Sequence, residues 1–350
     1  MEKFLEVKNL RVSYHSYAGE VQSVRGVSFS IDAGQSVAIV GESGCGKSAL
    51  CKSIMKLPPK TAKIKSGKIL VNGADITDYT EKNMSRLRGE LFSMVFQDPM
   101  TSLNPTITVG KQIGEAVRIH NKKMSRGQIR KRVIELMQLV EIDRPEERIR
   151  QYPHEFSGGM RQRAVMAIAL AGNPKILFAD EPTTALDVTI QAQILDVFRR
   201  IQKKLEMATV FISHDLGVVA GVADRVAVMY AGKIVEIGTA EEIFYDPRHP
   251  YTWGLLQSLP VLAEGKEWLP TLPGMPPTLI HPPKGDAFAE RNVYAMRIDY
   301  EKEPPMFRIT DTHYAATWLL DPRAPKAEMP PELKERIARM KKEAKIDDGE

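Results

Sequence analysis

A glycine-rich segment, GESGCGKS from Gly41 to Ser48, has the residue types and spacing of a phosphate-binding loop. It follows the apolar run QSVAIV and precedes a helical pattern, which is the context that this motif requires. The glycines let backbone N–H groups surround phosphate oxygens, Lys47 reaches the β- and γ-phosphates, and the Ser48 hydroxyl ligates Mg²⁺. Cys45 lies inside the loop and is interpreted as incidental, because its side chain can point away from the phosphates.

Two carboxylates come directly after another apolar run, ILFADEP. Asp180 is predicted to hold Mg²⁺ through water, and Glu181 to polarise an attacking water as general base. His214 follows the run TVFIS and is placed to touch the γ-phosphate, although taken alone it would be a core or capping histidine. Gln97 directly follows the apolar residues of the segment MVFQDP. An isolated glutamine at the end of a strand indicates little by itself.

A second candidate anion site lies in HEFSGGMRQRAVMAIALA, from His154 to Ala171. A serine and two glycines open a long amphipathic helix, and free N–H groups at a helix N-terminus bind anions. The segment has no lysine placed to hold a phosphate, and Gly41 to Ser48 already serves that purpose. The residues alone therefore leave open whose anion this helix holds.

The elements that position these groups alternate between strand and helix patterns. FLEVKNLRVSY, VRGVSFSI, QSVAIVG and GKILVNG predict strands of a mixed sheet, and helical periodicity runs from about Thr108 to Val140. NPKILFADEP and ATVFISHD, separated by an amphipathic helical run, predict a βαβ unit with functional groups at the carboxyl ends of its strands. RVAVMYAGKIVEIG predicts a hairpin that turns at Ala231 and Gly232. The fold class is α/β.

Composition sets broad limits on the molecule. The chain has 350 residues, of which 43% are hydrophobic, and a formal charge of +5. This charge suits nucleic acid or an anionic membrane surface as a partner, but solvated basic helix faces explain it as well. Cys45 and Cys51 provide neither a metal-binding quartet nor a disulfide framework. The apolar stretch Ala164 to Ala171 is too short to span a bilayer, which takes about 18 residues, and MEKFLEVKNL alternates like a strand. We expect a cytoplasmic chain.

The order and context of GESGCGKS, Gln97, FSGGMRQR, ILFADEP, TALD and the His214 segment resemble the ATP-binding subunits of ABC transporters over residues 1–245. This resemblance implies a RecA-like core, an antiparallel β-subdomain and a helical subdomain over about residues 98–158. Phe156 and Met160 stand where leucine and glutamine are more usual. Beyond Asp246 prolines crowd from Pro247 to Pro305, which predicts a small irregular C-terminal domain over 246–350, closed by a helix near Pro331 to Lys345.

The resemblance implies ATP and Mg²⁺ as cofactors and assigns roles to single residues. Tyr14 stacks on adenine, with Tyr17 as a weaker alternative. Glu181, His214, Gln97 and Lys47 are catalytic, and Ser48, Gln97 and, through water, Asp180 hold Mg²⁺. The implied ATP-binding residues are Tyr14, Gly41, Glu42, Ser43, Gly44, Cys45, Gly46, Lys47, Ser48, Ala49 and Gln97.

In the family, two ATP-binding subunits pair head to tail, so the signature of one closes over ATP held by the other. The resemblance thus makes Ser157, Gly158, Gly159 and Met160 (here the signature segment) act on the ATP of a partner. It places Asp187 at the dimer contact, and Gln97 links the nucleotide state to the membrane partner. DPMTSLNPTITVG, Asp98 to Gly110, is the expected permease contact.

The C-terminal sequence indicates a more specific group within this family. DPRHPYTWGLLQSLP, Asp246 to Pro260, followed by LPGMPP, resembles the extension of peptide importer ATPases of the Opp/Dpp type. Many of these have four cysteines for an iron–sulfur cluster, at positions that match Asp286, Asn292, Asp299 and Thr317 here. No thiolate remains, so no cluster is expected. The two aspartates could take a hard cation, but a polar surface turn is the simpler interpretation.

The resulting hypothesis is an ATP-hydrolysing subunit of an oligopeptide importer, peripheral on the cytoplasmic face of the membrane. Its expected partners are a second ABC ATPase in a head-to-tail heterodimer, two permease subunits and, through these, an extracellular peptide-binding protein. Dipeptides, nickel or haem are alternative substrates. A soluble ABC ATPase acting on nucleic acid is disfavoured, because the chain has one signature and no sustained heptads, and a P-loop kinase or regulatory module has no use for the signature.

Overall fold

The computed structural model describes residues 3–184, 186–259 and 272–344. It divides into two compact units, each assembled from several stretches of chain. The first consists chiefly of Leu70–Ile212 with Ser30–Ser36. The second contains Glu6–Phe29, Val37–Ile69 and the described residues from Ser213 onward. The predicted division at residues 245 and 246 stays a prediction.

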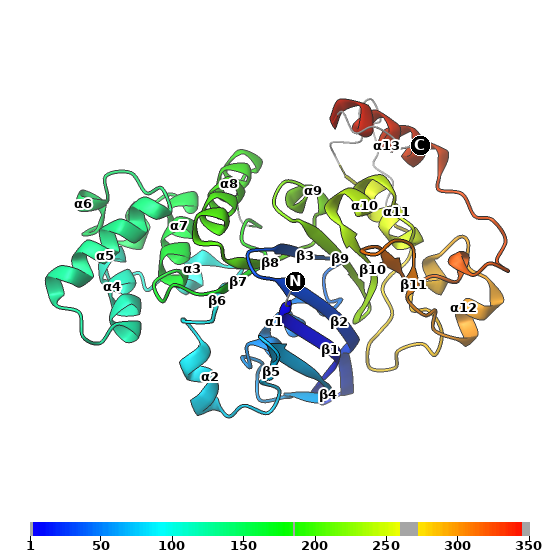
Figure 1. Ribbon diagram of the computed structural model, residues 1–350, viewed down its shortest axis with the longest axis horizontal. Helices are drawn as coiled ribbons and strands as arrows, with labels where there is room; N and C mark the ends of the chain where they lie inside the picture. The colour runs from blue at the N-terminus through cyan, green and yellow to red at the C-terminus, as the bar shows by residue number, and fades with distance from the viewer. Residues whose placement is uncertain (1–2, 185, 260–271, 345–350) are drawn as a thin grey trace. The chain divides into compact units, whose positions relative to one another are not determined.

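A parallel sheet forms the core of the first unit (Figure 1). Its strands lie in the order β6 (Phe92–Val95), β7 (Ile176–Asp180) and β8 (Ala208–Ser213). Every residue of β7 and β8 is buried, in keeping with their continuous apolar sequence. The sheet therefore places Asp180 and the residues after it at the carboxyl ends of its parallel strands.

Most other elements of the first unit are helices, and the predicted helical runs are confirmed. α4, α5 and α7 pack on one another, and α7 also contacts α8 and β6 (Figure 1). Ser125 starts α5 with a capping box to Gln128. α8 buries one face through Ile194, Phe198 and Ile201. The bounds are α2 (Glu81–Leu87), α3 (Pro99–Ser102), α4 (Val109–His120), α5 (Arg126–Leu139), α6 (Pro145–Arg148), α7 (Gly158–Ala169) and α8 (Val188–Leu205).

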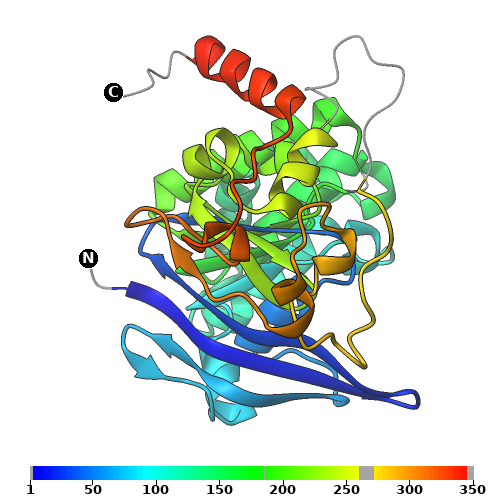
Figure 2. The ribbon, with the colours of Figure 1, turned by 90° about the vertical axis from the view of Figure 1, so that its right-hand side faces the viewer.

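The second unit contains long strands and a second set of sheet pairings (Figure 2). β1 (Lys3–Ser16) lies between β2 (Gly19–Asp32) and β4 (Ala62–Val71), and these three strands belong mainly to this unit. The last residues of β4 belong to the first unit, where Asn72 and Gly73 turn the chain into β5 (Ala74–Asp75). β3 (Ser36–Val40) pairs in parallel with β9 (Arg225–Tyr230), which pairs antiparallel with β10 (Lys233–Thr239). Ala231 and Gly232 have φ of 45° and 82°, so the predicted hairpin turn is confirmed.

The C-terminal part of the second unit adds short elements to this sheet. β12 (Tyr314–Ala315) pairs with β10, and β11 (Phe307–Arg308) pairs with β12. α13 (Pro331–Ala344) contacts α10 (Ala240–Tyr245) and α11 (Pro250–Gln257) (Figure 2). This confirms the predicted last helix, although Lys345 lies outside the described residues. The remaining helices are α1 (Lys47–Ile54), α9 (Leu216–Val219) and α12 (Arg297–Glu301).

Candidate functional site

The phosphate loop, Gly41 to Ser48, joins the buried strand β3 to helix α1 in the second unit. Gly44 and Gly46 have φ of 80° and 105°, a backbone region that favours glycine. A Cβ at Gly46 would lie 2.1 Å from the Ser23 carbonyl oxygen, and one at Gly41 would lie 2.0 Å from that of Met229. Gly46 is the N-cap of α1 and makes no side-chain cap, which suits this helix N-terminus to an anion.

The Lys47 side chain lies within the loop and is buried. Its Nζ donates hydrogen bonds to the carbonyl oxygens of Gly41, at 2.6 Å, and Glu42, at 3.0 Å. The Sγ of Cys45 lies 3.9 Å from the same ammonium. Burial raises the pKa of Cys45, so its thiol stays protonated at neutral pH and adds no charge to the loop.

A carboxylate, an amide and a hydroxyl meet in the first unit, after β6 and β7. The Nε2 of Gln97 donates to an Oε of Glu181 at 3.1 Å, and the Thr184 hydroxyl donates to the same oxygen at 3.0 Å. Glu181 has a left-handed backbone, with φ of 46°, and its N–H donates to the Ile212 carbonyl. The structure thus brings together Gln97 and Glu181, while Thr184 is a contact that sequence reasoning missed.

The signature segment forms the start of α7 in the first unit. Ser157 is the N-cap, and its Oγ accepts a hydrogen bond from the N–H of Met160 at 3.3 Å. A Cβ at Gly159 would lie 2.8 Å from the Cγ2 of Ile190, so α7 approaches α8 closely at this glycine. Asp187 caps α8 by accepting from the N–H of Ile190 at 3.0 Å. Ser157 and Asp187 are both exposed, on helix starts that pack against each other.

The other predicted site residues lie on strands or just after them. Tyr14 is on β1, and burial raises the pKa of its phenol. Tyr17 is fully exposed in the turn after β1, whereas Tyr14 is half-buried. Asp180 is buried as the last residue of β7, and His214 follows β8 and is exposed. The phosphate loop and His214 belong to the second unit, and Glu181 and the signature segment to the first.

Comparison with known proteins decides the family. Residues 24–184 match the model of the ABC transporter family, and residues 235–298 match the C-terminal region of oligopeptide/dipeptide transporters. The chain is 59% identical to the oligopeptide transport ATP-binding protein OppD of Bacillus subtilis, over 97% of this chain and 95% of that protein. The chain belongs to the ATP-binding subunits of ABC peptide importers. It is also 58% identical to the dipeptide transport ATP-binding protein DppD of Lactococcus lactis, over 93% of each chain.

Solved structures of ABC ATPases share its fold. The cassette cbiO1 from Clostridium perfringens is 29% identical, with a TM-score of 0.62 over 70% of this chain and 92% of that one. The cassette MJ0796, solved as a dimer bound to ADP and Pi, is 26% identical, with a TM-score of 0.60 over 67% of this chain and 98% of that one. The chain is an ATPase of this family. No helix in the described part of the chain has the length and apolar character needed to cross a membrane.

The C-terminal region of this ABC ATPase buries the four residues that the sequence resemblance assigned to cluster-cysteine positions. Asp286, Asn292, Asp299 and Thr317 are each at most 8% exposed, so a surface turn is the wrong description. Each accepts a hydrogen bond from a backbone N–H two or three residues away, of Phe288, Tyr294, Met296 and Leu319. Within the described part of the chain, no three or more His, Cys, Asp or Glu side chains are grouped to hold a metal. The four act as buried turn caps.

Burial also sets the protonation of this region. It raises the pKa of Asp286 to about 6, and the negative charge of Asp299 contributes in the same direction. The Oδ1 of Asp286 accepts the N–H of Phe288, while its buried Oδ2 has no hydrogen-bond partner. Burial is likewise the main cause of the raised pKa of Asp299. Ionised Asp286 therefore destabilises the fold near neutral pH.

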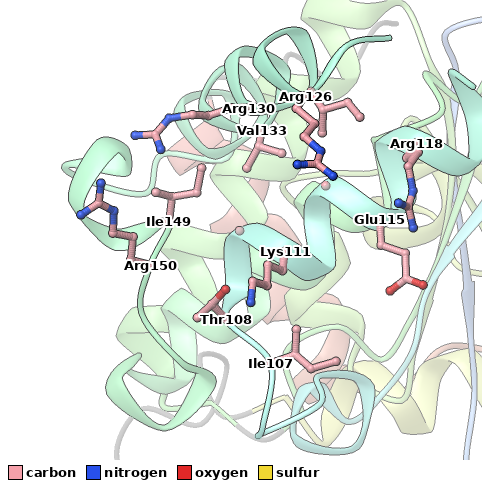
Figure 3. Close-up of a pocket in the computed structure, with 13 residues that line it drawn as sticks. Ile107, Thr108, Lys111, Glu115, Arg118, Arg126, Arg130, Val133, Ile149 and Arg150 are labelled. Atoms are coloured by element: carbon pink, nitrogen blue, oxygen red, sulfur yellow. The ribbon is translucent and has the colours of Figure 1, made fainter. Parts of the chain in front are cut away.

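A groove of about 640 Å³ in the first unit is lined by basic side chains (Figure 3). Lys111 and Arg118 come from α4, Arg126 and Arg130 from α5, and Arg150 follows α6. These side chains are exposed, and Glu115 is the acidic residue among them. Ile107, Thr108 and Gly110 of the predicted permease contact also line this basic groove.

Proposed function

We propose that the phosphate loop binds ATP with Mg²⁺ and that Glu181 is the general base of its hydrolysis. The observation that carries this proposal is the Glu181 carboxylate, which accepts hydrogen bonds from both Gln97 and Thr184. These two hydrogen bonds hold the carboxylate in one orientation, in which it accepts a proton from the attacking water. The water oxygen then attacks the γ-phosphorus, the bond to the β-phosphate oxygen breaks, and Glu181 receives the proton.

In this proposal the phosphate loop binds the phosphates of ATP. Gly44 and Gly46 hold the left-handed backbone of the loop, and the Lys47 ammonium, which donates to the carbonyls of Gly41 and Glu42, would turn to the β- and γ-phosphates. Ser48 and, through water, Asp180 would hold Mg²⁺, with Gln97 as a further ligand. When bound, the metal neutralises phosphate charge.

The signature segment acts on the ATP of a second subunit in this proposal. Its N-cap serine is exposed at the start of α7, and the chain already has a phosphate loop of its own. An exposed helix N-terminus with an oriented hydroxyl complements the terminal phosphates of a nucleotide. Asp187, at the adjacent helix start, then lies at the contact between the paired ATPases.

The transport partners follow from the same proposal. The chain pairs with a second ABC ATPase at the cytoplasmic face of the membrane, and the pair docks on two permease subunits that receive peptide from an extracellular binding protein. The segment Asp98 to Gly110 is the proposed permease contact, and the basic groove beside it favours a permease loop with acidic side chains or a helix C-terminus. Gln97 directly precedes this segment, so it connects the docking surface to Glu181.

The transported substrate is a peptide, and we propose oligopeptides. Relatives named for oligopeptide and for dipeptide transport are nearly equally similar, so similarity alone does not separate these two sizes. Nickel and haem are the remaining importer alternatives. Action on nucleic acid has no support beyond a net charge of +5. Purification with two permeases supports the importer, whereas stable ATP-dependent binding to DNA would contradict it.

The general-base assignment is tested with Glu181→Gln in the full chain. ATP binding should persist, because the change keeps the side chain's size and its acceptor oxygen, while turnover should fall about 100-fold or more. Glu146→Gln, an exposed glutamate on α6 of the same unit, is the matched control and should leave turnover unchanged. Persistent turnover in Glu181→Gln would show that another group takes the proton.

A further inference from the structure

The phosphate loop contains a carboxylate that is paired with a distant arginine. The two terminal nitrogens of Arg291 donate to the two carboxylate oxygens of Glu42, at 2.6 and 2.9 Å. The side chain of Arg291 is only 4% exposed and that of Glu42 is 27% exposed. The pair is separated by 249 residues, so a positive charge from the C-terminal region neutralises the Glu42 carboxylate.

Arg291 is itself fixed by several contacts. Its Nε donates to the Pro273 carbonyl at 2.7 Å, and one terminal nitrogen donates to the Tyr230 hydroxyl at 3.2 Å. The guanidinium carbon lies 5.6 Å from the ring centre of Tyr230 and 5.9 Å from that of Phe288. Hydrogen bonding to Glu42 is the main cause that raises the pKa of Arg291 above its ordinary value. Its charge is therefore permanent and held in one place.

The backbone of Glu42 is also held from the C-terminal region. Its N–H donates to the Tyr251 hydroxyl oxygen at 2.9 Å, and its carbonyl accepts from Lys47 at 3.0 Å. Tyr251 is buried, and its ring centre lies 4.6 Å from that of Tyr230 and 5.4 Å from that of Phe288. When Lys47 turns to a nucleotide, the contacts from Tyr251 and Arg291 are the ones that stay.

We propose that Arg291 and Tyr251 are positioning residues for ATP binding, which fix the phosphate loop at Glu42 and cancel the charge of its carboxylate. A carboxylate in a loop that surrounds phosphates repels the triphosphate, and a desolvated site strengthens this repulsion. The buried guanidinium removes the repulsion, and the tyrosine hydroxyl sets the path of the backbone. This inference rests on the proposed role of the loop in ATP binding.

The first test compares two matched arginines of the full chain by the Kd for MgATP, measured by calorimetry. Arg291→Gln should raise Kd about tenfold or more, because it leaves the Glu42 charge unpaired beside the bound anion. Arg297→Gln is the control and should change Kd by less than about twofold, because Arg297 is exposed and forms its ion pair with the exposed Glu301. Equal Kd values for the two variants would overturn the proposal.

A double-mutant cycle separates charge cancellation from general support of the fold. In the Glu42→Gln background, Arg291→Gln should raise Kd by less than about threefold, because no carboxylate is left unpaired. A penalty of the same size in both backgrounds would show that Arg291 only supports the fold. Tyr251→Phe should raise Kd about threefold through loss of one hydrogen bond. An unchanged Kd in this variant would remove Tyr251 from the proposal.

Two further measurements separate a loss of nucleotide binding from a failure to fold, and the role of the loop from that of Arg291. Thermal melting without nucleotide identifies any variant that does not fold. If Arg291→Gln is one, Arg291→Lys replaces it, with an expected Kd rise of about threefold from the lost bidentate geometry. Normal MgATP binding by Lys47→Ala would refute the role of the loop itself, whereas loss of binding there with normal binding by Arg291→Gln would refute only the role of Arg291.

Discussion

Backbone strain and a close contact both constrain the phosphate loop at Gly46, and this leads to a prediction that needs no transport assay. The φ of 105° at this position is strained for any residue with a Cβ, at about 1–3 kcal/mol. A Cβ there would also lie 2.1 Å from the Ser23 carbonyl oxygen, a backbone atom that cannot rotate away. Overpacking of this kind adds about 1–3 kcal/mol. Gly46→Ala should therefore cost about 2–6 kcal/mol of stability.

Gly73 provides the matched control for the same substitution. Its φ of 76° is also left-handed, but a Cβ there would meet no heavy atom within 4 Å. Gly73→Ala should cost only the backbone strain, about 1–2 kcal/mol. Urea unfolding measures both variants, and the Kd for MgATP should rise only in Gly46→Ala, where the loop must move. Equal stability loss in the two variants, together with a normal Kd in Gly46→Ala, would refute the close-contact argument.

Three further predictions concern other parts of the molecule. Ser157→Arg should leave MgATP binding to this subunit's own loop intact and reduce hydrolysis at the partner's loop; normal turnover there would count against action in trans. Arg118→Glu with Arg130→Glu should weaken co-purification with the permeases without changing the Kd for MgATP; undiminished co-purification would exclude the basic groove from docking. Asp286→Asn should stabilise the chain above pH 6 by up to about 3 kcal/mol, since burial raises the Asp286 pKa from 3.8 to about 6. Because the penalty arises as pH increases from about 4 to about 6, this difference should disappear near pH 4 in urea titrations.

Most strands and helices could be predicted from the sequence, because periodicity and turn residues are local signals. β7 was predicted from an unbroken apolar run, and the turn at Ala231 and Gly232 from a glycine that interrupts two strand patterns. The loop from Gly41 to Ser48 was predicted for the same reason, since its motif lies within eight residues. The Gln97 contact with Glu181, in contrast, joins residues 84 apart, and only the family resemblance assigned both residues to one site.

Contacts between distant residues explain what sequence reasoning could not predict. An acidic residue in a glycine-rich loop is normally solvated, so nothing near Glu42 indicated a buried partner. Asp286 and Asp299 were interpreted as surface residues for the same reason, yet both are buried as turn caps. Burial of a polar side chain depends on which segments cover it, and a local pattern contains no information on that.

Glu236 shows that contacts cross the boundary predicted at residue 245. Its carboxylate is fully buried on β10 and accepts hydrogen bonds from the N–H groups of Arg248 and His249, at 2.6 and 3.1 Å. The Nε2 of His313 lies 2.8 Å from it, so these partners all follow residue 245. A carboxylate that stays buried without these partners costs about 3–5 kcal/mol, so the partners stabilise Glu236 in its place. Since Arg291 and Tyr251 meet the phosphate loop from the same region, we infer that the residues after 245 are needed for the ATP-binding part to fold into its active shape.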